Sequence, residues 1–274
     1  MGRVIISGGS RATIPYVGPK ASLTPTSGVT YTEGLSGLEP AEISSYAQAI
    51  SNVTGVTNDT TAMYIDYDDV HRKISIGNQV TIGVNNVNYA FDVIGFNHDD
   101  LTNSNAYGKA TATGKAGMTL QMHDLFATAY KMNSSNTNVG GWKESLMRTS
   151  TMPIMKGYLP VAWQTAIKPI NKVSGIGGGS SSGTETVSDS CFLLAEIEIF
   201  GSITFSVSGE GTQYAYYKVG NSKVKNRGGS AAVWSERSPC SGYDDAFCNV
   251  TASGTVDWNR SPNAYRGVAF GFCI

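Results

Sequence analysis

The sequence predicts an α+β protein in which short strands and two main helical segments are connected by long loops. Three observations lead to this prediction. Charged residues make up only 15% of the 274 residues, against about 25% in average domains, and there are 32 glycines, which favours strands and turns. Apolar residues make up 41% of the chain, enough to form a large core. Helical and strand-like periodicities also occur in separate segments.

The first 96 residues are expected to form one helix and a β-hairpin. Residues 1–38 are short apolar runs broken by Gly, Pro, Ser and Thr, which indicates extended segments and turns. Residues 39–50 predict a short helix, because a proline stands in the first turn and the apolar residues share one face. Residues 73–82 and 89–96 predict the two strands of a hairpin joined by a turn over 83–88.

The middle of the chain is expected to be helical. Residues 118–132 carry an apolar stripe with helical spacing. A second helical segment begins at residues 142–148, is interrupted at Pro153 and resumes over 159–168. Residues 174–189 are rich in glycine and serine and predict a flexible surface loop rather than a linker between domains.

The last third is expected to return to short strands. An apolar run over residues 191–200 predicts a buried strand, and further short strands are expected at 213–217, 231–234 and 267–274.

Composition excludes several classes of partner. The net charge is −1 and no run of Lys or Arg occurs, so a nucleic acid is not expected as the main partner. No stretch approaches the roughly 20 apolar residues that span a bilayer, so no membrane insertion is expected. Residues 1–9 lack the apolar core of a secretory signal.

The four cysteines are predicted to be buried free thiols rather than disulfides. A domain of this size does not need disulfides for stability, and Cys248 and Cys273 stand among aromatic residues that look like core. Cys191 and Cys240 complete the set, and no Cys/His spacing indicates zinc.

Polar clusters elsewhere do not argue for catalysis. Residues 97–100 (Asn-His-Asp-Asp) have the residue types of a metal or acid–base site, but a turn that caps the preceding strand is favoured. Residues 66–71 lack the central Gly and closing Glu of a calcium loop, and residues 177–180 lack the Gly-Lys-Ser/Thr ending of a phosphate loop. No enzymatic activity, cofactor or metal is therefore predicted.

Residues 232–274 carry the strongest functional signal. Short core-like pieces alternate there with Tyr, Asp, Asn, Ser, Thr, Arg and Trp, the types that form adaptable binding surfaces. Residues 240–266 contain no Lys, Glu, Gln or Met, although these types supply 34 residues of the whole chain. Asn codons with randomised adenines and a pyrimidine in third place would yield Tyr, Asp, Ser, Thr, Gly, Ala, Arg, Cys and Asn. They would not yield Lys, Glu, Gln, Met or Trp, so Trp258 is the exception to this explanation.

Two sets of segments resemble a known family. The C-terminal segments resemble variable proteins that are served by diversity-generating retroelements in gut phages and bacteria. They are Trp234–Pro239, Phe247–Val250, Gly254 and Gly267–Ile274. Upstream segments resemble the same gut-associated domain family, so that the resemblance covers roughly residues 70–274. They are Val93–Leu101, Gly140–Arg148, Ile167–Lys172 and Phe192–Phe200.

This resemblance implies a C-type-lectin-like fold, akin to the phage major tropism determinant and to formylglycine-generating enzymes. It implies a framework of Trp234, Arg237, Phe247, Cys248, Val250, Phe270 and Phe272. The displayed candidate contacts are Ser241, Tyr243, Asp244, Asp245, Asn249, Thr251, Ser253, Thr255, Asp257, Trp258, Asn259, Arg260, Asn263, Tyr265 and Arg266. Tyr, Trp and Arg would be the energetic anchors. The reactive cysteine pair of the enzymes and the calcium motif of sugar-binding lectins are not found, so binding is expected to be metal-independent.

The resulting expectation is a phage receptor-binding protein at the tip of a tail fibre, assembled in the host cytoplasm. Its ligand would be a bacterial cell-surface protein or glycan. Residues 1–60 would form an N-terminal attachment and oligomerisation region that contacts other virion tail proteins, with a homotrimer favoured. Residues 61–274 would form the binding domain, with its variable region at about 234–274. Alternatives are a bacterial cell-surface or secreted adhesin, an oxidative enzyme of the formylglycine-generating type and a purely structural fibre protein.

Overall fold

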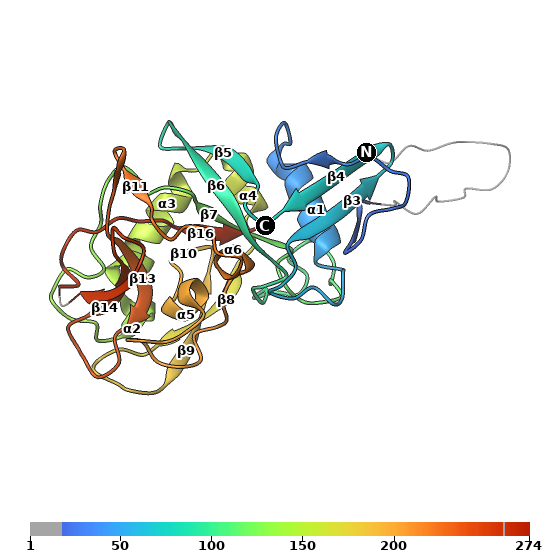
Figure 1. Ribbon diagram of the computed structural model, residues 1–274. Helices are drawn as coiled ribbons and strands as arrows, with labels where there is room; N and C mark the ends of the chain where they lie inside the picture. The colour runs from blue at the N-terminus through green and yellow to red at the C-terminus, as the bar shows by residue number, and fades with distance from the viewer. Residues whose placement is uncertain (1–17, 260) are drawn as a thin grey trace, which may run out of the picture.

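A five-stranded antiparallel sheet lies at the centre of the molecule (Figure 1). The computed structural model describes residues 18–259 and 261–274. The strand order of the central sheet is β10-β16-β7-β6-β5. The strands are β5 (Gln79–Val84), β6 (Val87–Phe96), β7 (Met118–Met122), β10 (Cys191–Phe192) and β16 (Gly271–Cys273). Because β16 lies between β10 and β7, the C-terminus of the chain completes the core.

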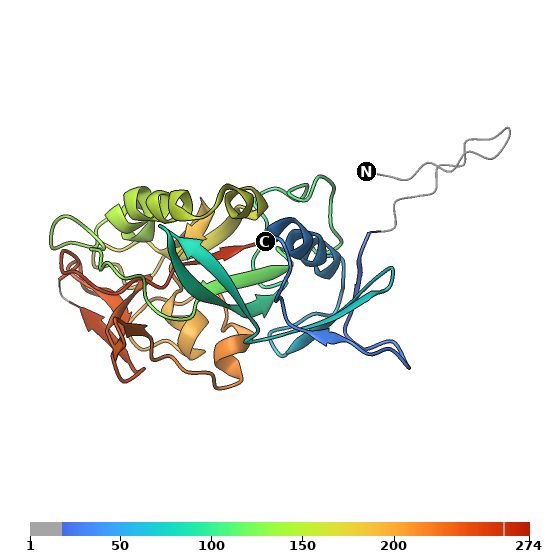
Figure 2. The same cartoon turned by 90° about the horizontal axis from the view of Figure 1, so that it is seen from above.

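Helices cover both faces of this sheet, which gives the α+β architecture that the sequence predicts. Figure 2 shows the yellow-green helical layer of residues 141–166 on one side and the orange helices α5 and α6 on the other. The first layer contains α2 (Gly141–Glu144), the π-helical turn η1 (Met147–Thr151), α3 (Met152–Tyr158) and α4 (Val161–Ala166). The second contains α5 (Glu196–Phe200) and α6 (Ala215–Lys218).

A separate four-stranded sheet is formed by the N-terminal part of the chain. Its order is β1-β3-β4-β2, with β1 (Lys20–Ser22), β2 (Thr32–Glu33), β3 (Ala62–Tyr67) and β4 (Val70–Ser75). The sheet therefore contains strands from both sides of residue 60, where the sequence predicts a boundary between the N-terminal region and the binding domain. Helix α1 (Pro40–Ile50) connects this unit to the main core, because Gly117 approaches it so closely that a Cβ there would lie 1.8 Å from the carbonyl oxygen of Ala47.

The C-terminal third adds small sheets at the opposite end of the molecule. The β8–β9 hairpin (Ile170–Gly175 and Thr184–Asp189) contains the glycine-rich residues 176–183 in its loop. The loop expected over 174–189 is therefore wrong at both ends, because residues 174–175 and 184–189 pair as strands. The strands β11 (Asn226–Arg227) and β12 (Ser230–Ala231) form a short ribbon. A three-stranded sheet then contains β13 (Trp234–Pro239), β14 (Phe247–Val250) and β15 (Val256–Asn259). Figures 1 and 2 both place β13 and β14 far from the N-terminal sheet.

Several expected elements are confirmed. Helix α1 begins at Pro40, and α2 and α4 occupy the expected helical segments. The interruption expected at Pro153 is wrong, because Pro153 lies in the first turn of α3, which continues from η1. The expected hairpin is present as β5 and β6, but residues 73–75 belong to β4 and the turn is shorter than 83–88. It is formed by Asn85 and Asn86 at φ values of 49° and 63°. Asparagine tolerates this left-handed conformation better than most residues, which suits a two-residue hairpin turn.

The helix expected over residues 118–132 is wrong. Residues 118–122 form β7, which pairs with β6 and β16, and the chain continues as a loop. All five residues of β7 are buried, including Thr119 and Gln121. A central strand covered on both faces loses the alternation of apolar and polar residues, and its methionines happen to fall at helical spacing.

Two predicted strands also contain helices. The run over 191–200 is a strand only at Cys191–Phe192, and α5 begins at Glu196 because the Glu198 carboxylate accepts the main-chain N–H of Ala195. The segment 213–217 contributes to α6 instead of forming a strand. In such short segments tertiary contacts outweigh the strand propensity of Ile and Tyr.

The four cysteines are free and buried in the structure, in agreement with the sequence prediction. Among residues 18–259 and 261–274, none of the helices has the length and apolar character needed to cross a membrane.

Candidate ligand-binding face

The β13-β14-β15 sheet forms the frame of the candidate face. Trp234 pairs with Val250 and Cys248 pairs with Trp258 in antiparallel register. The expected framework residues are all buried, with at most 1% of each side chain's surface exposed: Trp234, Arg237, Phe247, Cys248, Val250, Phe270 and Phe272. The frame is therefore part of the protein interior, and its side chains are not available to a ligand.

Most of the expected contact residues lie on the surface. Seven are exposed: Tyr243, Asp244, Ser253, Thr255, Asp257, Asn263 and Tyr265. Five are half-buried: Ser241, Asp245, Thr251, Trp258 and Arg266. Exposure reaches 42% for Tyr243 and 64% for Tyr265.

Three of the expected contact residues are not among these surface residues. Asn249 is only 3% exposed and its side-chain amide donates to the main-chain carbonyl of Phe247. Its expected place among the displayed residues is wrong, because at this position β14 turns the side chain into the protein. Asn259 is placed only as a main-chain partner of Phe247 in β15. Arg260 lies outside the described residues.

An aromatic pair forms one part of the face. The rings of Tyr243 and Trp258 have centroids 4.4 Å apart. The Trp258 ring also contacts the ring of Phe205, at a centroid distance of 6.3 Å. Beneath them is a small apolar cluster that contains Cys240 and Cys248, with the two sulfur atoms 3.7 Å apart. Burial raises the pKa of the Cys248 thiol well above its usual range, so this thiol stays protonated and packs as a small apolar side chain.

Hydroxyl groups form a second part of the face. The Oγ1 atom of Thr251 lies 2.7 Å from Oγ1 of Thr255 and 2.9 Å from Oγ of Ser253. These residues form the turn between β14 and β15, which Gly254 closes at a φ of 81°. Hydroxyls that bond one another can exchange those bonds for bonds to a polar ligand.

Tyr265 and Arg266 belong to a third segment. The main chain of Arg266 pairs with Tyr130 in both directions, at N–O distances of 2.9 and 3.0 Å. The ammonium of Lys131 lies 4.8 Å from the centre of the Tyr265 ring, a cation–π contact. The exposed Tyr265 is thereby held on a fixed main chain.

Asn138 positions the loop that carries Tyr243. Its side-chain amide donates to the carbonyl oxygens of Tyr243 at 2.8 Å and Ala246 at 2.6 Å, and its side-chain oxygen accepts the N–H of Gly178 at 2.8 Å. The N–H of Asn138 itself donates to the carbonyl of Asp244 at 2.7 Å. One buried residue thus connects the 241–246 loop to the glycine-rich loop. Sequence reasoning missed Asn138, because its partners lie about 40 and 105 residues away.

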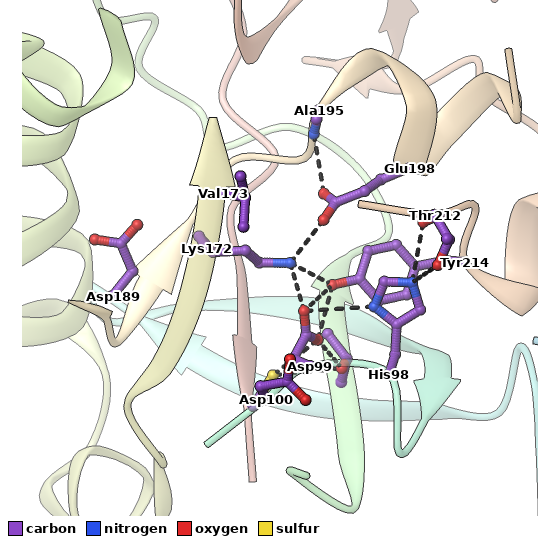
Figure 3. A network of polar contacts seen from close by, with 12 residues as sticks. His98, Asp99, Asp100, Lys172, Val173, Asp189, Ala195, Glu198, Thr212 and Tyr214 are labelled. Atoms are coloured by element: carbon purple, nitrogen blue, oxygen red, sulfur yellow. Dashed lines mark hydrogen bonds and ion pairs between the residues drawn. The ribbon is translucent and has the colours of Figure 1, made fainter. Parts of the chain in front are cut away.

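A buried network of charges supports the frame from below (Figure 3). The ammonium of Lys172 donates to Asp99 at 2.6 Å, Glu198 at 2.9 Å and the Tyr214 hydroxyl at 2.7 Å. Arg237 on β13 binds both carboxylate oxygens of Glu198, at 2.5 and 3.0 Å. Two acids and two cations therefore balance one another in the interior, which a buried ion network requires.

The electrostatics of this network are set by the two cations. Burial alone would raise the pKa of Asp99, but Lys172 and the surrounding hydrogen bonds outweigh burial and hold that pKa well below its usual range. Burial opposes the ionised form of Glu198 in the same way, and Arg237 followed by Lys172 lowers its pKa. Both carboxylates are therefore ionised at neutral pH.

The cluster at residues 97–100 is part of this support and not a turn that satisfies its own backbone. Asn97 donates to the distant carbonyls of Ile50 and Val53. The ring of His98 stacks on Tyr214, with centroids 3.8 Å apart (Figure 3). Asp99 is inaccessible to a substrate because its side chain is only 4% exposed. Across the described part of the chain, no group of three or more His, Cys, Asp or Glu residues is arranged to hold a metal ion.

The fold and this face define an α+β protein whose C-terminal sheet displays aromatic, acidic and hydroxyl side chains above a buried, charge-compensated frame. Residues 116–274, more than half of the chain, match DUF6273, a family described as a domain of unknown function. The chain belongs to that family. Its match includes β7, the helical layer and the β13-β14-β15 sheet, whereas the N-terminal sheet precedes it. Neither the curated proteins nor the solved structures contain a match.

Proposed function

We propose that this protein binds a ligand on a bacterial cell surface through its C-terminal face, as the receptor-binding protein at the tip of a phage tail fibre. The fold of the binding domain would be C-type-lectin-like, and the face would be diversified by a retroelement. The proposal concerns binding without catalysis. The sequence resemblance of residues 70–274 gives the proposal its biological setting.

The observation that carries the proposal is the difference in burial between the framework residues and the expected contact residues. Within a few residues of one another, the frame residues are buried to 1% or less while Tyr243 and Tyr265 are 42% and 64% exposed. Large exposed aromatic side chains on a rigid support are typical of binding hot spots, since they provide contact area at a small cost in conformational entropy.

The arrangement of the two ends of the molecule supports attachment through the N-terminal part. The β1-β3-β4-β2 sheet lies at the end opposite β13 and β14 (Figures 1 and 2). A protein fixed through that sheet would direct its C-terminal face outward. Contacts with other tail proteins, and a homotrimer, would therefore involve the N-terminal end.

The test is a binding assay of purified, fluorescently labelled protein on intact bacterial cells from a gut community. The variants Tyr243→Ala and Tyr265→Ala, alone and combined, should lose at least about tenfold in affinity, as expected for hot-spot truncation. Tyr265 is 64% exposed, so Tm should change little when it is replaced. Tyr243 is 42% exposed and contacts the Trp258 ring, so a modest decrease in Tm is expected for its replacement. Val161→Ala, at a 76% exposed apolar residue of α4, is the matched control.

Equal cell binding by the combined variant and the wild type would overturn the proposal. Immunogold labelling of phage particles would then distinguish the two biological settings. Label at fibre tips supports the phage protein, whereas label confined to the bacterial envelope would replace it with an adhesin that uses the same face.

A further inference from the structure

A cavity of about 380 Å³ opens on a different part of the molecule, between the η1–α3 segment and the end of the β8–β9 hairpin. Arg148, Thr149, Met152 and Lys156 line it from the helical side. Ser188 and Ser190 line it from the strand side. None of its lining residues belongs to the C-terminal face, so a ligand bound here is independent of the proposed function.

The guanidinium of Arg148 is held rigidly at this cavity. Its Nε donates to Asp189 at 2.7 Å, and its two Nη atoms donate to the carbonyls of Lys143 and Ser188, each at 3.1 Å. The second oxygen of Asp189 accepts the indole N–H of Trp142 at 2.7 Å, and both of those side chains are buried. A pre-positioned guanidinium loses little conformational entropy when it binds a ligand.

Donors at the cavity outnumber acceptors. A guanidinium carries five N–H groups, and the three bonds of Arg148 leave one N–H on each Nη without an acceptor among the described residues. The ammonium of Lys156 makes one bond, to Ser190 Oγ at 3.3 Å, and no described carboxylate forms an ion pair with it. Asp189 compensates the charge of Arg148, so the ammonium of Lys156 leaves the cavity with an excess positive charge.

The backbone at the cavity is also unusual. Arg148 and Thr149 lie in the π-helical turn η1, which runs directly into α3. π-helical turns are rare in proteins and are frequently found at functional sites. Here it places Arg148 against Asp189 while α3 brings Lys156 to the same opening.

We propose that this cavity binds a small organic oxyanion, of about the size of a sugar acid. The free N–H groups of Arg148 and the ammonium of Lys156 would receive the carboxylate, phosphate or sulfate group, since charge-assisted bonds from Arg are suited to planar and tetrahedral oxyanions. The apolar surface of Met152 and Pro153 would contact the rest of the molecule.

Isothermal titration calorimetry on the full chain tests the proposal with glucuronate, glucose 6-phosphate, sodium sulfate and neutral glucose. Saturable binding is expected for glucuronate or glucose 6-phosphate, more tightly than for sulfate, and not for glucose. Lys156→Gln should weaken that binding by roughly tenfold or more, because it removes a charged donor. Lys143→Gln should leave it unchanged, since Lys143 pairs with Glu185 outside the cavity.

A preference for glucuronate over the phosphate and sulfate would identify a carboxylate ligand, and the reverse preference would identify a tetrahedral one. Both outcomes support the oxyanion site. Absence of saturable binding for both glucuronate and glucose 6-phosphate, with the protein folded by circular dichroism, would overturn it, whether or not sulfate binds. Equal affinity in Lys156→Gln and wild type would do so as well.

Discussion

The side-chain amide of Asn138 donates a hydrogen bond of 2.8 Å to the main-chain carbonyl of Tyr243, although the two residues are 105 positions apart. The same amide donates to Ala246, so both sides of the loop that carries Tyr243, Asp244 and Asp245 are attached to one buried residue. The loop can therefore vary in side chains while its main chain keeps one conformation.

Replacing Asn138 should loosen this loop. Asn138→Ala leaves the carbonyl of Tyr243 and the N–H of Gly178 without this partner, whereas the carbonyl of Ala246 keeps the N–H of Cys240. Each partner lost from a buried group costs about 1–3 kcal/mol. We expect a fall in the urea midpoint and a loss of cell binding comparable to that of Tyr243→Ala. Asn221→Ala, which removes one local bond from an amide to the carbonyl of Tyr216, is the control. If Asn138→Ala bound cells normally, the loop would not depend on this residue.

The pairing of Arg237 with Glu198 should be essential for the frame. Arg237→Met leaves Glu198 with Lys172 as its only cation in the buried network, and breaking a buried ion pair costs about 3–5 kcal/mol. Arg237→Lys keeps the charge but loses the two-point contact. Denaturant unfolding should rank the stabilities as wild type, then Lys, then Met. An order in which Met is more stable than Lys would show that apolar packing matters more here than charge.

Stability should fall as the solution becomes strongly acidic, partly through Asp99. Its pKa is lowered in the folded protein, so its ionised form contributes stability above its unfolded pKa of about 3.9. That contribution is lost as the pH falls through and below that value. Asp99→Asn should be less stable than wild type at neutral pH, because Lys172 and Tyr214 lose an ionised partner. Its urea midpoint should also depend less steeply on pH in the acidic range. Parallel curves for variant and wild type would contradict this assignment.

Glu236 should have the opposite pH dependence. None of the described residues hydrogen-bonds either of its carboxylate oxygens, and burial together with the nearby acids Glu196 and Glu210 raises its pKa well above the usual range. The folded protein therefore retains a proton that the unfolded chain releases above about pH 4.3, so this group makes stability decrease as the pH rises, by at most about 1.4 kcal/mol per pH unit.

The substitution Glu236→Gln removes this ionisation. Urea midpoints measured between about pH 5 and about pH 8 should decline in wild type and decline less in the variant. Glu144→Gln, at an exposed residue of α2, should follow the wild-type curve. If the Glu236→Gln and wild-type curves were parallel, the carboxyl would be ionised in the fold and would have to be compensated by another group.

The sequence predicted the parts of this protein whose signals are local. The α1 helix and the Asn85–Asn86 turn have local causes, namely an N-terminal proline and residues that tolerate a positive φ. Framework residues such as Trp234 and Phe272 were also separable from displayed ones. By contrast, β7 looks helical until its two neighbouring strands are known. The partners of Asn138 and Lys172 are distant in sequence, so their roles depend on tertiary structure alone.

Trp258 contacts both the buried apolar cluster and the exposed face, so its replacement should affect both stability and ligand binding. The residue is half-buried, its ring packs against the Tyr243 ring at a tilt of 34°, and it contacts the cluster of Cys240 and Cys248. Trp258→Ala should weaken cell binding and also lower stability, because truncating a large packed aromatic side chain removes apolar burial.

The variant Trp258→Tyr separates the two effects. It keeps an aromatic ring above the thiol cluster, so most of the stability should return, while the smaller ring changes the contact area offered to the ligand. Cell binding at a temperature well below Tm of both variants is the measurement. If Trp258→Ala lost stability but bound cells as well as wild type, the ring would belong to the frame alone. Tyr243 and Tyr265 would then be the remaining aromatic anchors of the face.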